Sequence, residues 1–432
     1  MMSAAYLLYN MVAGAAAPPM LAGAAISGRL RGHWRDRLGL VPSLGESGEA
    51  RVWVHAVSAG EIQAAIPLIA ALKKHESGLS VWLSTTTAAG RQAAKDQLPA
   101  GCPIITYPLD MYGSPARAMN RLKPSLVILL ETELWPNFLR VARIRGIKTM
   151  LANGRISDRS VRRYRRVVFL FREVLANLDM MAMIREEDRE RIISMGADPG
   201  RVKRVGNAKY DFLLQRVDPG RVIHLRQALG LADDRPVLVA GSTRSGEEIM
   251  VLNAFERLRG EFPRLHLILA PRHIQRAGLI ESRIRARGLT MKRFSQDMDF
   301  PQKETSVTLV DVIGELFYCY GLATVAFCGG SLVPLGGQNP LEAAAWGRPV
   351  LYGPYMDDFK DAREMLEPTG GGQTVVDTTA LVHRIRAMLT SPREAEARGQ
   401  AALECLRRHE GASIRLAAMA LDLLAMDKRV GT

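Results

Sequence analysis

Short apolar runs alternate with longer amphipathic segments along most of the chain. In the first half the apolar runs are 51–57, 80–86, 104–107, 125–130, 148–152 and 180–184. The segments between them predict helices, as in 61–74, where Ile62, Ile66 and Ile69 lie on one face. Strands that are apolar throughout and alternate with helices predict a parallel sheet that is covered on both faces.

The same alternation starts again in the second half of the chain. Its apolar runs are 236–243, 265–270, 307–310, 325–328 and 349–352. The polar stretch between the halves contains Pro219 and Gly220 and predicts a linker. Because 432 residues exceed one ordinary core, we predict an α/β protein with two doubly wound Rossmann-like domains that face a cleft. The expected domains are 29–212 and 220–400, and 401–432 is expected to be a helix that packs back on the first domain.

The N-terminal segment differs from the rest of the chain. Residues 4–26 carry no charge, and four arginines follow shortly after, Arg29, Arg31, Arg35 and Arg37. An apolar span followed by arginines predicts a membrane anchor over 1–28, spanning or dipping, with the remainder on the cytoplasmic side. The alternative is a helix that packs on its own domain.

Net charge indicates the kind of partner, and cysteine content indicates which kinds of site are absent. The formal net charge is +14, which favours an anionic partner such as nucleic acid, a membrane surface or a phosphorylated substrate. The four cysteines lie far apart in the sequence, so neither a zinc site nor a disulfide framework is indicated. A DxD pattern at Asp297 and Asp299 follows no clear strand, and we expect no metal there.

A glutamate follows the first predicted strand. The sequence "VSAGE" places Glu61 at the start of an apolar helix, where the helix dipole alone favours an acidic residue. The second half repeats the arrangement in "AGSTRSGEE", with Glu247 in the matching place. Because ligands of parallel sheets bind at the carboxyl ends of the strands, both glutamates are expected to face the same cleft. Glu61 is therefore either a helix-terminus charge or a general base.

The most specific motif lies in the second half, between residues 327 and 354. A strand ends in the first glycine pair, Gly329 and Gly330, and a second pair at 336–337 precedes the sequence "QNPLE". Glycines allow backbone N–H groups to approach a phosphate, and a helix N-terminus adds partial positive charge. Glu342 cannot bind phosphate, but its carboxylate suits a sugar hydroxyl such as that of a ribose.

Other polar residues also follow predicted strands. Arg272 ends the 265–270 strand, where a guanidinium suits a phosphate or carboxylate. The loop at 314–316 offers backbone groups that can read the edge of a base. In the first half, Glu131 and Glu133 end a buried strand, where carboxylates are costly unless they have a use. Lys209 lies near the linker and is expected to reach an anion across the cleft. The arginine-rich stretch at 159–166 is expected to be a solvated helix face or a contact for a lipid head group.

These motifs together resemble a known family. "SAGE", "ETELWPN", "GNAKYD", "GSTRSGEE", "APRH", "GEL" and "GGQNPLEAA" occur here in the order seen in the 3-deoxy-D-manno-octulosonic acid (Kdo) transferases of lipopolysaccharide synthesis. The resemblance runs to about residue 365. It implies the glycosyltransferase B fold and transfer of Kdo from CMP-Kdo to a lipid A precursor, lipid IVA. It also implies a location at the cytoplasmic face of the cell inner membrane and no metal or other cofactor.

The resemblance also assigns roles to residues. It implies that Glu61 is the catalytic base and that Glu131 and Lys209 stabilise the transition state. The implied CMP contacts are Pro271, Arg272, Ile313, Gly314, Glu315, Leu316, Asn339, Pro340, Leu341 and Glu342. The chain departs from the family pattern at Gln338, Tyr355 and Asp358. We expect the helix N-terminus to lower the pKa of Glu61 and keep it ionised, and a single displacement with inversion.

Two other functions compete with Kdo transfer. Within the same fold, a lipid-linked N-acetylglucosaminyl transferase or a sugar-nucleotide 2-epimerase would use a UDP donor, so stabilisation by UDP rather than CMP would favour them. A basic nucleic-acid-binding protein would explain the charge of +14. It would not explain two glycine-rich strand ends or the uncharged N-terminal segment.

Overall fold

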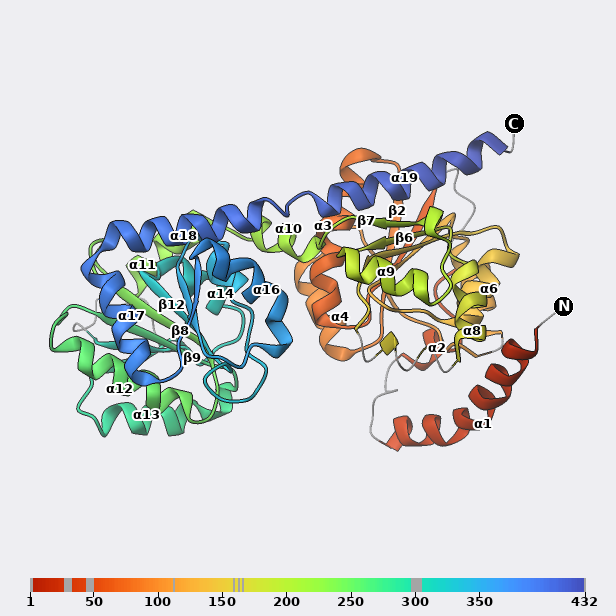
Figure 1. Cartoon of the computed structure of the whole chain (residues 1–432). Helices are drawn as coiled ribbons and strands as arrows, with labels where there is room; N and C mark the ends of the chain where they lie inside the picture. Colours follow the sequence, from red (N-terminus) through yellow and green to blue (C-terminus); the bar gives the residue numbers. More distant parts are fainter. Residues whose placement is uncertain are drawn as a thin grey trace. The chain divides into compact units, whose positions relative to one another are not determined.

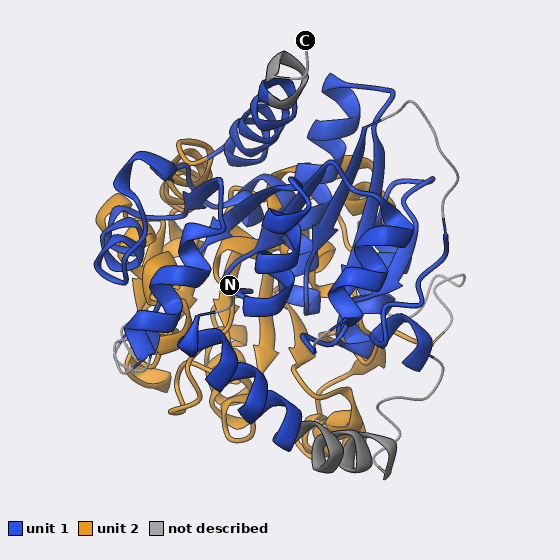
Figure 2. Ribbon diagram, turned by 90° about the vertical axis from the view of Figure 1, so that its right-hand side faces the viewer, with its two compact units in different colours: residues 1–212, 410–432 blue, residues 213–409 orange. Residues whose placement is uncertain are grey.

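The computed structural model (Figure 1) describes residues 3–26, 33–43, 50–111, 113–157, 160–161, 164, 167–296 and 305–430. The chain divides into two compact units, which Figure 2 shows in different colours. Unit 1 consists of Met1–Phe212 and Glu410–Thr432, and unit 2 consists of Leu213–His409.

Unit 1 contains a seven-stranded parallel sheet in the order β3-β2-β1-β4-β5-β6-β7. The strands are β1 (Arg51–His55), β2 (Ser80–Thr85), β3 (Ile104–Thr106), β4 (Leu126–Leu130), β5 (Lys148–Gly154), β6 (Met180–Met183) and β7 (Val202–Arg204). Six of them occupy the apolar runs predicted from the sequence. β7 was missed because only one of its three residues, Val202, is apolar.

Two sets of helices cover the two faces of this sheet. One face packs against α3 (Ala59–His75), α4 (Ala88–Gln97) and α19 (Ala412–Val430). The other packs against α5 (Ser114–Leu122), α6 (Pro136–Ile144), α8 (Val168–Ala176) and α9 (Glu186–Ser194). Neighbouring residues of one strand alternate between the faces, since Val52 and Val54 join the first core and Trp53 joins the second.

Unit 2 repeats this architecture with the strand order β10-β11-β9-β8-β12-β13-β14. Its strands are β8 (Val237–Thr243), β9 (His266–Pro271), β10 (Met291–Arg293), β11 (Val307–Leu309), β12 (Val325–Cys328), β13 (Val350–Tyr352) and β14 (Gly372–Thr374). β10 and β14 are again short edge strands that the sequence pattern missed. The helices are α11 (Pro219–Ala228), α12 (Glu247–Arg259), α13 (Ala277–Arg285), α14 (Leu316–Leu322), α15 (Leu341–Ala344), α16 (Lys360–Leu366), α17 (Thr378–Thr390) and α18 (Pro392–Arg407). Figure 1 shows α12 and α13 on one side of the sheet and α11 and α18 on the other.

Each sheet has one point at which the strand order reverses. In unit 1 the chain proceeds from β1 to β2 on one side and later returns to β4 on the other. In unit 2 the same reversal lies between β8 and β12. Ligands of doubly wound sheets bind outside the carboxyl ends of the strands at such a reversal. The loops after β1, β4, β8 and β12 are therefore the places to search for a site.

The N-terminal segment 1–28, expected to be a membrane anchor, contains helix α1 (Ala4–Ile26), whose first turns pack on unit 1. The Tyr6 hydroxyl donates to the Pro136 carbonyl at 3.2 Å, and the Tyr9 hydroxyl donates to Asp110 at 2.8 Å. The opposite face of these turns is apolar and exposed, with Met11 71% accessible. Among the helices that the structure describes, none combines the length and apolar character needed to cross a membrane.

The C-terminal helix α19 is tied to unit 1 by a carboxylate of α10 (Ala208–Gln215). Asp211 accepts hydrogen bonds from the backbone N–H groups of Gly411 and Ser413 at 2.8 and 2.6 Å, and from the Ser413 hydroxyl at 2.5 Å. Of the expected C-terminal segment 401–432, α18 ends in unit 2 at Arg407, whereas α19 contributes to the core of unit 1.

Candidate functional site

A buried carboxylate lies at the strand-order reversal of unit 1. Glu61 is in the first turn of α3, directly after β1, and its side chain returns to the loop that connects the two elements. Its Oε2 accepts from the backbone N–H of Val57 at 2.7 Å, and its Oε1 accepts from the Ser58 hydroxyl at 3.1 Å. Glu61 is only 8% exposed. The short loop of small residues thus holds one carboxylate at the carboxyl edge of the sheet.

The environment of Glu61 raises its pKa, which corrects the prediction that the helix N-terminus lowers it. Burial is the largest cause, and the nearby carboxylate of Glu131 adds to it. The hydrogen bonds from Val57 and Ser58 and the charge of Lys209 act in the opposite direction but do not compensate. Loss of hydration therefore outweighs the hydrogen bonds and the cation that favour the ionised form of Glu61.

Glu131 and Lys209 form an ion pair beside Glu61. Glu131 follows β4, the neighbour of β1 in the sheet, and Lys209 is the second residue of α10. The Lys209 Nζ lies 2.5 Å from Glu131 Oε1, with both side chains about one-quarter to one-third exposed. The sequence predicted that Lys209 reaches an anion, and in the structure that anion is a carboxylate of its own unit.

A third carboxylate, Glu133, belongs to the same cluster. The sequence pattern singled it out as part of an acidic pair, but the family resemblance assigned it no role. Trp135 Nε1 donates to Glu133 Oε2 at 2.8 Å. Burial, followed by the charge of Glu61, raises the pKa of Glu133 to about 7. The signal that could have found it is its spacing, because Glu131 and Glu133 are two residues apart at the end of a buried strand.

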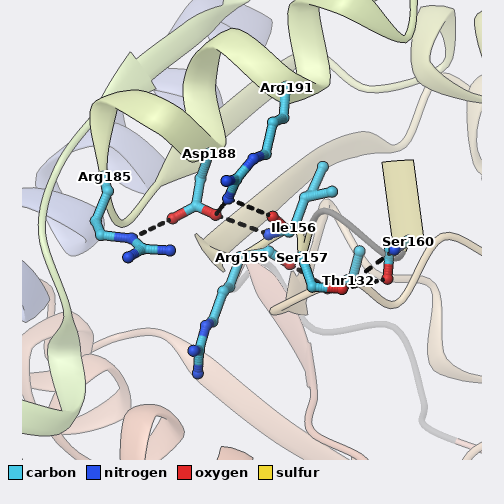
Figure 3. A network of polar contacts seen from close by, with 8 residues as sticks. All are labelled: Thr132, Arg155, Ile156, Ser157, Ser160, Arg185, Asp188 and Arg191. Atoms are coloured by element: carbon cyan, nitrogen blue, oxygen red, sulfur yellow. Dashed lines mark hydrogen bonds and ion pairs between the residues drawn. The ribbon is translucent and has the colours of Figure 1, made fainter. Parts of the chain in front are cut away.

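A polar network holds the loop after β5 next to the loop that carries these carboxylates (Figure 3). Buried Asp188 accepts from the Ile156 N–H at 2.9 Å and from Arg185 Nε at 3.1 Å. Thr132, which lies between the two glutamates, donates from its hydroxyl to the Arg155 carbonyl. Figure 3 shows the Arg155 side chain pointing away from Asp188. The arginines of the expected basic face, Arg159, Arg162, Arg163, Arg165 and Arg166, lie outside the described residues.

Glu247 of unit 2 has a structural role, so the prediction that it faces the cleft like Glu61 is wrong. Its Oε2 accepts from the N–H groups of Arg244 and Gly330 at 2.8 and 2.6 Å. Its Oε1 accepts from those of Ser331 and Leu332 at 2.9 and 2.8 Å. Four backbone donors occupy this fully buried carboxylate, which therefore holds the glycine-containing loop after β12 against the end of β8.

Glycines are required in that loop because the backbone approaches other segments closely. A Cβ on Gly329 would lie 2.6 Å from the Thr243 Cα, and Gly330 has a φ of 70°. The N–H of Gly337 donates to the Gly330 carbonyl at 2.8 Å, which brings the two glycine pairs together. Asp358, one of the departures from the family pattern, donates its N–H to the Gly336 carbonyl at 2.9 Å.

The predicted donor contacts of unit 2 lie after β9, β11 and β12, at the carboxyl edge of the sheet. Arg272 has an exposed side chain, and its backbone N–H donates to the Thr243 carbonyl at 3.0 Å. Burial raises the pKa of Glu342, whereas the charges of Arg216 and Arg272 lower it, so these three groups lie within electrostatic reach of one another. Asn339 accepts from the Leu341 N–H at 3.1 Å and so holds the turn before α15.

The remaining predicted contacts, 313–316, form the turn between β11 and α14. Ile313 is 85% exposed and Gly314 has a φ of 100°. Glu315 pairs with Arg221 at 2.5 Å, and that arginine also lies over the Tyr318 ring.

In the described residues, no group of three or more His, Cys, Asp or Glu side chains is arranged to hold a metal ion. The DxD pattern of the sequence, Asp297 and Asp299, at which no metal was expected, lies outside the described residues.

Comparison with known proteins identifies the family. Residues 32–212 match the family model described as 3-deoxy-D-manno-octulosonic-acid transferase (kdotransferase). The 3-deoxy-D-manno-octulosonic acid transferase of Haemophilus influenzae is 32% identical over 92% of each chain. That of Bordetella pertussis is 36% identical over 85% of this chain and 86% of its own.

The solved structures support the fold. A UDP-GlcNAc 2-epimerase from Neisseria meningitidis, bound to UDP-GlcNAc, has a TM-score of 0.59 at 14% identity and covers 87% of this chain and 100% of its own. At that identity the likeness concerns the fold alone, and it confirms the predicted pair of doubly wound domains of the glycosyltransferase B type. With relatives of this similarity over nearly the whole chain, the protein belongs to the family of 3-deoxy-D-manno-octulosonic acid transferases and is a glycosyltransferase.

Proposed function

We propose that this Kdo transferase moves Kdo from CMP-Kdo to lipid IVA, a lipid A precursor, with Glu61 as the general base. Family membership supports Kdo transfer in lipopolysaccharide biosynthesis. The observation that carries the finer proposal is the buried carboxylate of Glu61 at the strand-order reversal of unit 1, beside the Glu131–Lys209 pair. A ligand of a doubly wound sheet is expected at this place.

The proposed step is a single displacement at the anomeric carbon of Kdo. An acceptor hydroxyl gives its proton to Glu61 while its oxygen forms the new glycosidic bond. The bond between the anomeric carbon and the CMP phosphate oxygen breaks, CMP leaves with the electron pair, and the configuration inverts. Because burial raises the pKa of Glu61, its ionised form is a stronger base than a solvated glutamate.

Unit 2 has groups that suit the nucleotide part of the donor. The glycines at 329–330 and 336–337 allow close approach of a phosphate to the backbone, and exposed Arg272 offers a guanidinium. Glu342 is of the chemical type that accepts from ribose hydroxyls. Leaving-group charge is then stabilised by protein cations, so we propose that no metal or other cofactor is required. Chelation with EDTA should leave the transfer rate unchanged.

We also propose that the protein works at the cytoplasmic face of the cell inner membrane. The exposed apolar face of α1, formed by Leu7, Leu8, Met11 and Val12, suits an interfacial anchor, and the net charge of +14 suits anionic lipids. Replacing these four residues with serine should reduce co-flotation with vesicles of phosphatidylethanolamine and phosphatidylglycerol. Unchanged flotation would contradict this assignment of the anchor.

The decisive experiment measures the product directly. The purified protein is incubated with CMP-Kdo and tetraacylated lipid IVA, and the lipid is analysed by mass spectrometry for added Kdo. Glu61→Gln should abolish transfer while CMP still raises the thermal midpoint, and Glu76→Gln, an exposed glutamate at the other end of α3, is the matched control. Absence of added Kdo with the unmodified protein would overturn the proposed acceptor, and a covalent Kdo adduct on Glu61 would overturn the single displacement.

A further inference from the structure

Two neighbouring strands of unit 1 end in residues with left-handed backbone conformation. Glu131 after β4 has a φ of 57°, and Asn153 at the end of β5 has a φ of 53°. Residues other than glycine adopt this conformation rarely, and asparagine tolerates it best. Such residues persist where the surroundings hold them, and they cluster at functional sites. The two positions are also linked directly, because the Glu131 N–H donates to the Ala152 carbonyl at 3.0 Å.

The side chain of Asn153 holds the first turn of α10. It is fully buried, and its Oδ1 accepts from the N–H of Ala208, the first residue of that helix, at 2.9 Å. The N-terminal N–H groups of a helix have no partner within the helix, so an outside acceptor fixes where the helix begins. Asn153 therefore determines the place of α10 relative to the end of β5.

The residue after Ala208 is Lys209, whose ammonium pairs with Glu131. The contacts close a ring: the end of β4 binds the end of β5 through Glu131 and Ala152, β5 binds α10 through Asn153 and Ala208, and α10 returns to β4 through Lys209. Asp211 of α10 accepts hydrogen bonds from backbone N–H groups at the start of α19, and these contacts hold the other side of α10. Removal of the Asn153 oxygen would leave the Ala208 N–H without this acceptor at the start of the helix.

From this ring we infer that Asn153 is the positioning residue of the Lys209–Glu131 pair. Its side-chain oxygen holds the start of α10, and so sets the distance between the ammonium and the carboxylate beside Glu61. The inference rests on the proposed Kdo transfer and on the transition-state role that the family resemblance implies for Glu131 and Lys209. Asn153 is not a catalytic residue, because its side chain is fully buried and acts through Lys209.

Two substitutions separate the backbone conformation of Asn153 from the hydrogen bond that its side chain accepts. Asn153→Gly keeps the left-handed backbone but removes the acceptor for Ala208. Asn153→Asp keeps an acceptor and a residue tolerant of this φ. We expect Asn153→Gly to lower kcat by about tenfold or more, because misplacement of a group near the reacting atoms is costly. KM for CMP-Kdo should stay within about twofold, as expected for an interaction used in the transition state, and Asn153→Asp should retain more kcat than Asn153→Gly.

A double-mutant cycle distinguishes positioning from general destabilisation. If Asn153 acts through Lys209, Asn153→Gly should have little further effect on kcat in a Lys209→Met background. Asp377→Gly is the control, because Asp377 accepts from the Ala380 N–H at 2.7 Å and so caps α17 in unit 2. It should lower thermal stability without changing kcat. Additive effects of the two unit 1 substitutions, or an unchanged kcat in Asn153→Gly, would overturn the inference.

Amide hydrogen exchange supplies a readout that does not depend on Kdo transfer. Exchange at Ala208 and Lys209 should be faster in Asn153→Gly than in the unmodified protein, and close to normal in Asn153→Asp. Unchanged exchange in Asn153→Gly would show that the helix does not depend on this side chain and would overturn the inference. If the unmodified protein failed to transfer Kdo, the proposed function would fall, while the exchange rates would still decide whether Asn153 holds α10.

Discussion

Glu133 offers a direct test of the charge balance in the carboxylate cluster. Its pKa is raised from 4.5 to about 7, first by burial and then by the charge of Glu61. Glu133→Gln removes the ionisable group and leaves an oxygen that can accept from Trp135 Nε1. The substitution therefore changes charge with little change in shape.

The sign of the stability effect follows from the direction of this shift. Between pH 4.5 and about 7 the unfolded chain has released the proton of Glu133 and the folded chain still holds it, so the stability contributed by this group falls as pH rises. The shift corresponds to about 3 kcal/mol at about 1.4 kcal/mol per pKa unit. Because the side chain is partly exposed, solvent screening reduces the expected effect to roughly 2 kcal/mol.

The assay is urea unfolding of the protein at pH 5 and pH 8. Hydrogen exchange of the β1 and β4 amides monitors the unfolding, so that the signal comes from unit 1. Glu133→Gln should be more stable than the unmodified protein by roughly 2 kcal/mol at pH 8, with a much smaller difference at pH 5. Glu76→Gln, at an exposed position, is the control for the loss of one carboxylate. An equal difference at both pH values, or a loss of stability confined to pH 8, would refute the reasoning.

Three further results are expected. The acid limb of kcat/KM should lie above pH 4.5, since the pKa of Glu61 is raised, and Glu131→Gln should move it to lower pH, because the Glu131 carboxylate is one cause of that raised pKa; a limb that does not move would exclude coupling of the two groups. Glu247→Gln should cost about 3 kcal/mol in unfolding free energy, because the new amide faces backbone donors, and CMP should no longer raise the thermal midpoint; persistent protection would contradict this. Asp211→Ala should remove about 2 kcal/mol or more and speed proteolysis within α19, whereas an unchanged cleavage rate would argue against its anchoring role.

Whether a strand could be predicted from the sequence depended on how many apolar residues it contains. Eleven apolar runs predicted from the sequence correspond to strands in the structure, whereas β7, β10 and β14, each with three residues, were missed. Central strands of a parallel sheet are apolar on both faces, so they stand out from the helices around them. Each of the missed strands has at most one apolar side chain, so it presents neither an apolar run nor a clear alternation.

The candidate site was predictable in its position but only partly in its chemistry. The family resemblance implied roles for Glu61, Glu131 and Lys209, and the structure brings these three residues together. The repeated Gly-Glu pattern was misleading at Glu247, because nothing local shows that three N–H groups of one distant loop bind that carboxylate. Asn153 also gave no local signal, since its partner lies 55 residues further along the chain.

The sequence alone determined the two doubly wound sheets, the strand ends that carry polar groups and the resemblance to Kdo transferases, because each is written in local patterns and short motifs. Only the tertiary structure decided the direction of the Glu61 pKa shift, the membership of Glu133 in the cluster and the different role of Glu247. Hydration and charge interaction depend on distances between segments remote in the chain. The helix-terminus argument is local, and it gave the wrong direction because burial is the largest cause of the pKa shift at Glu61.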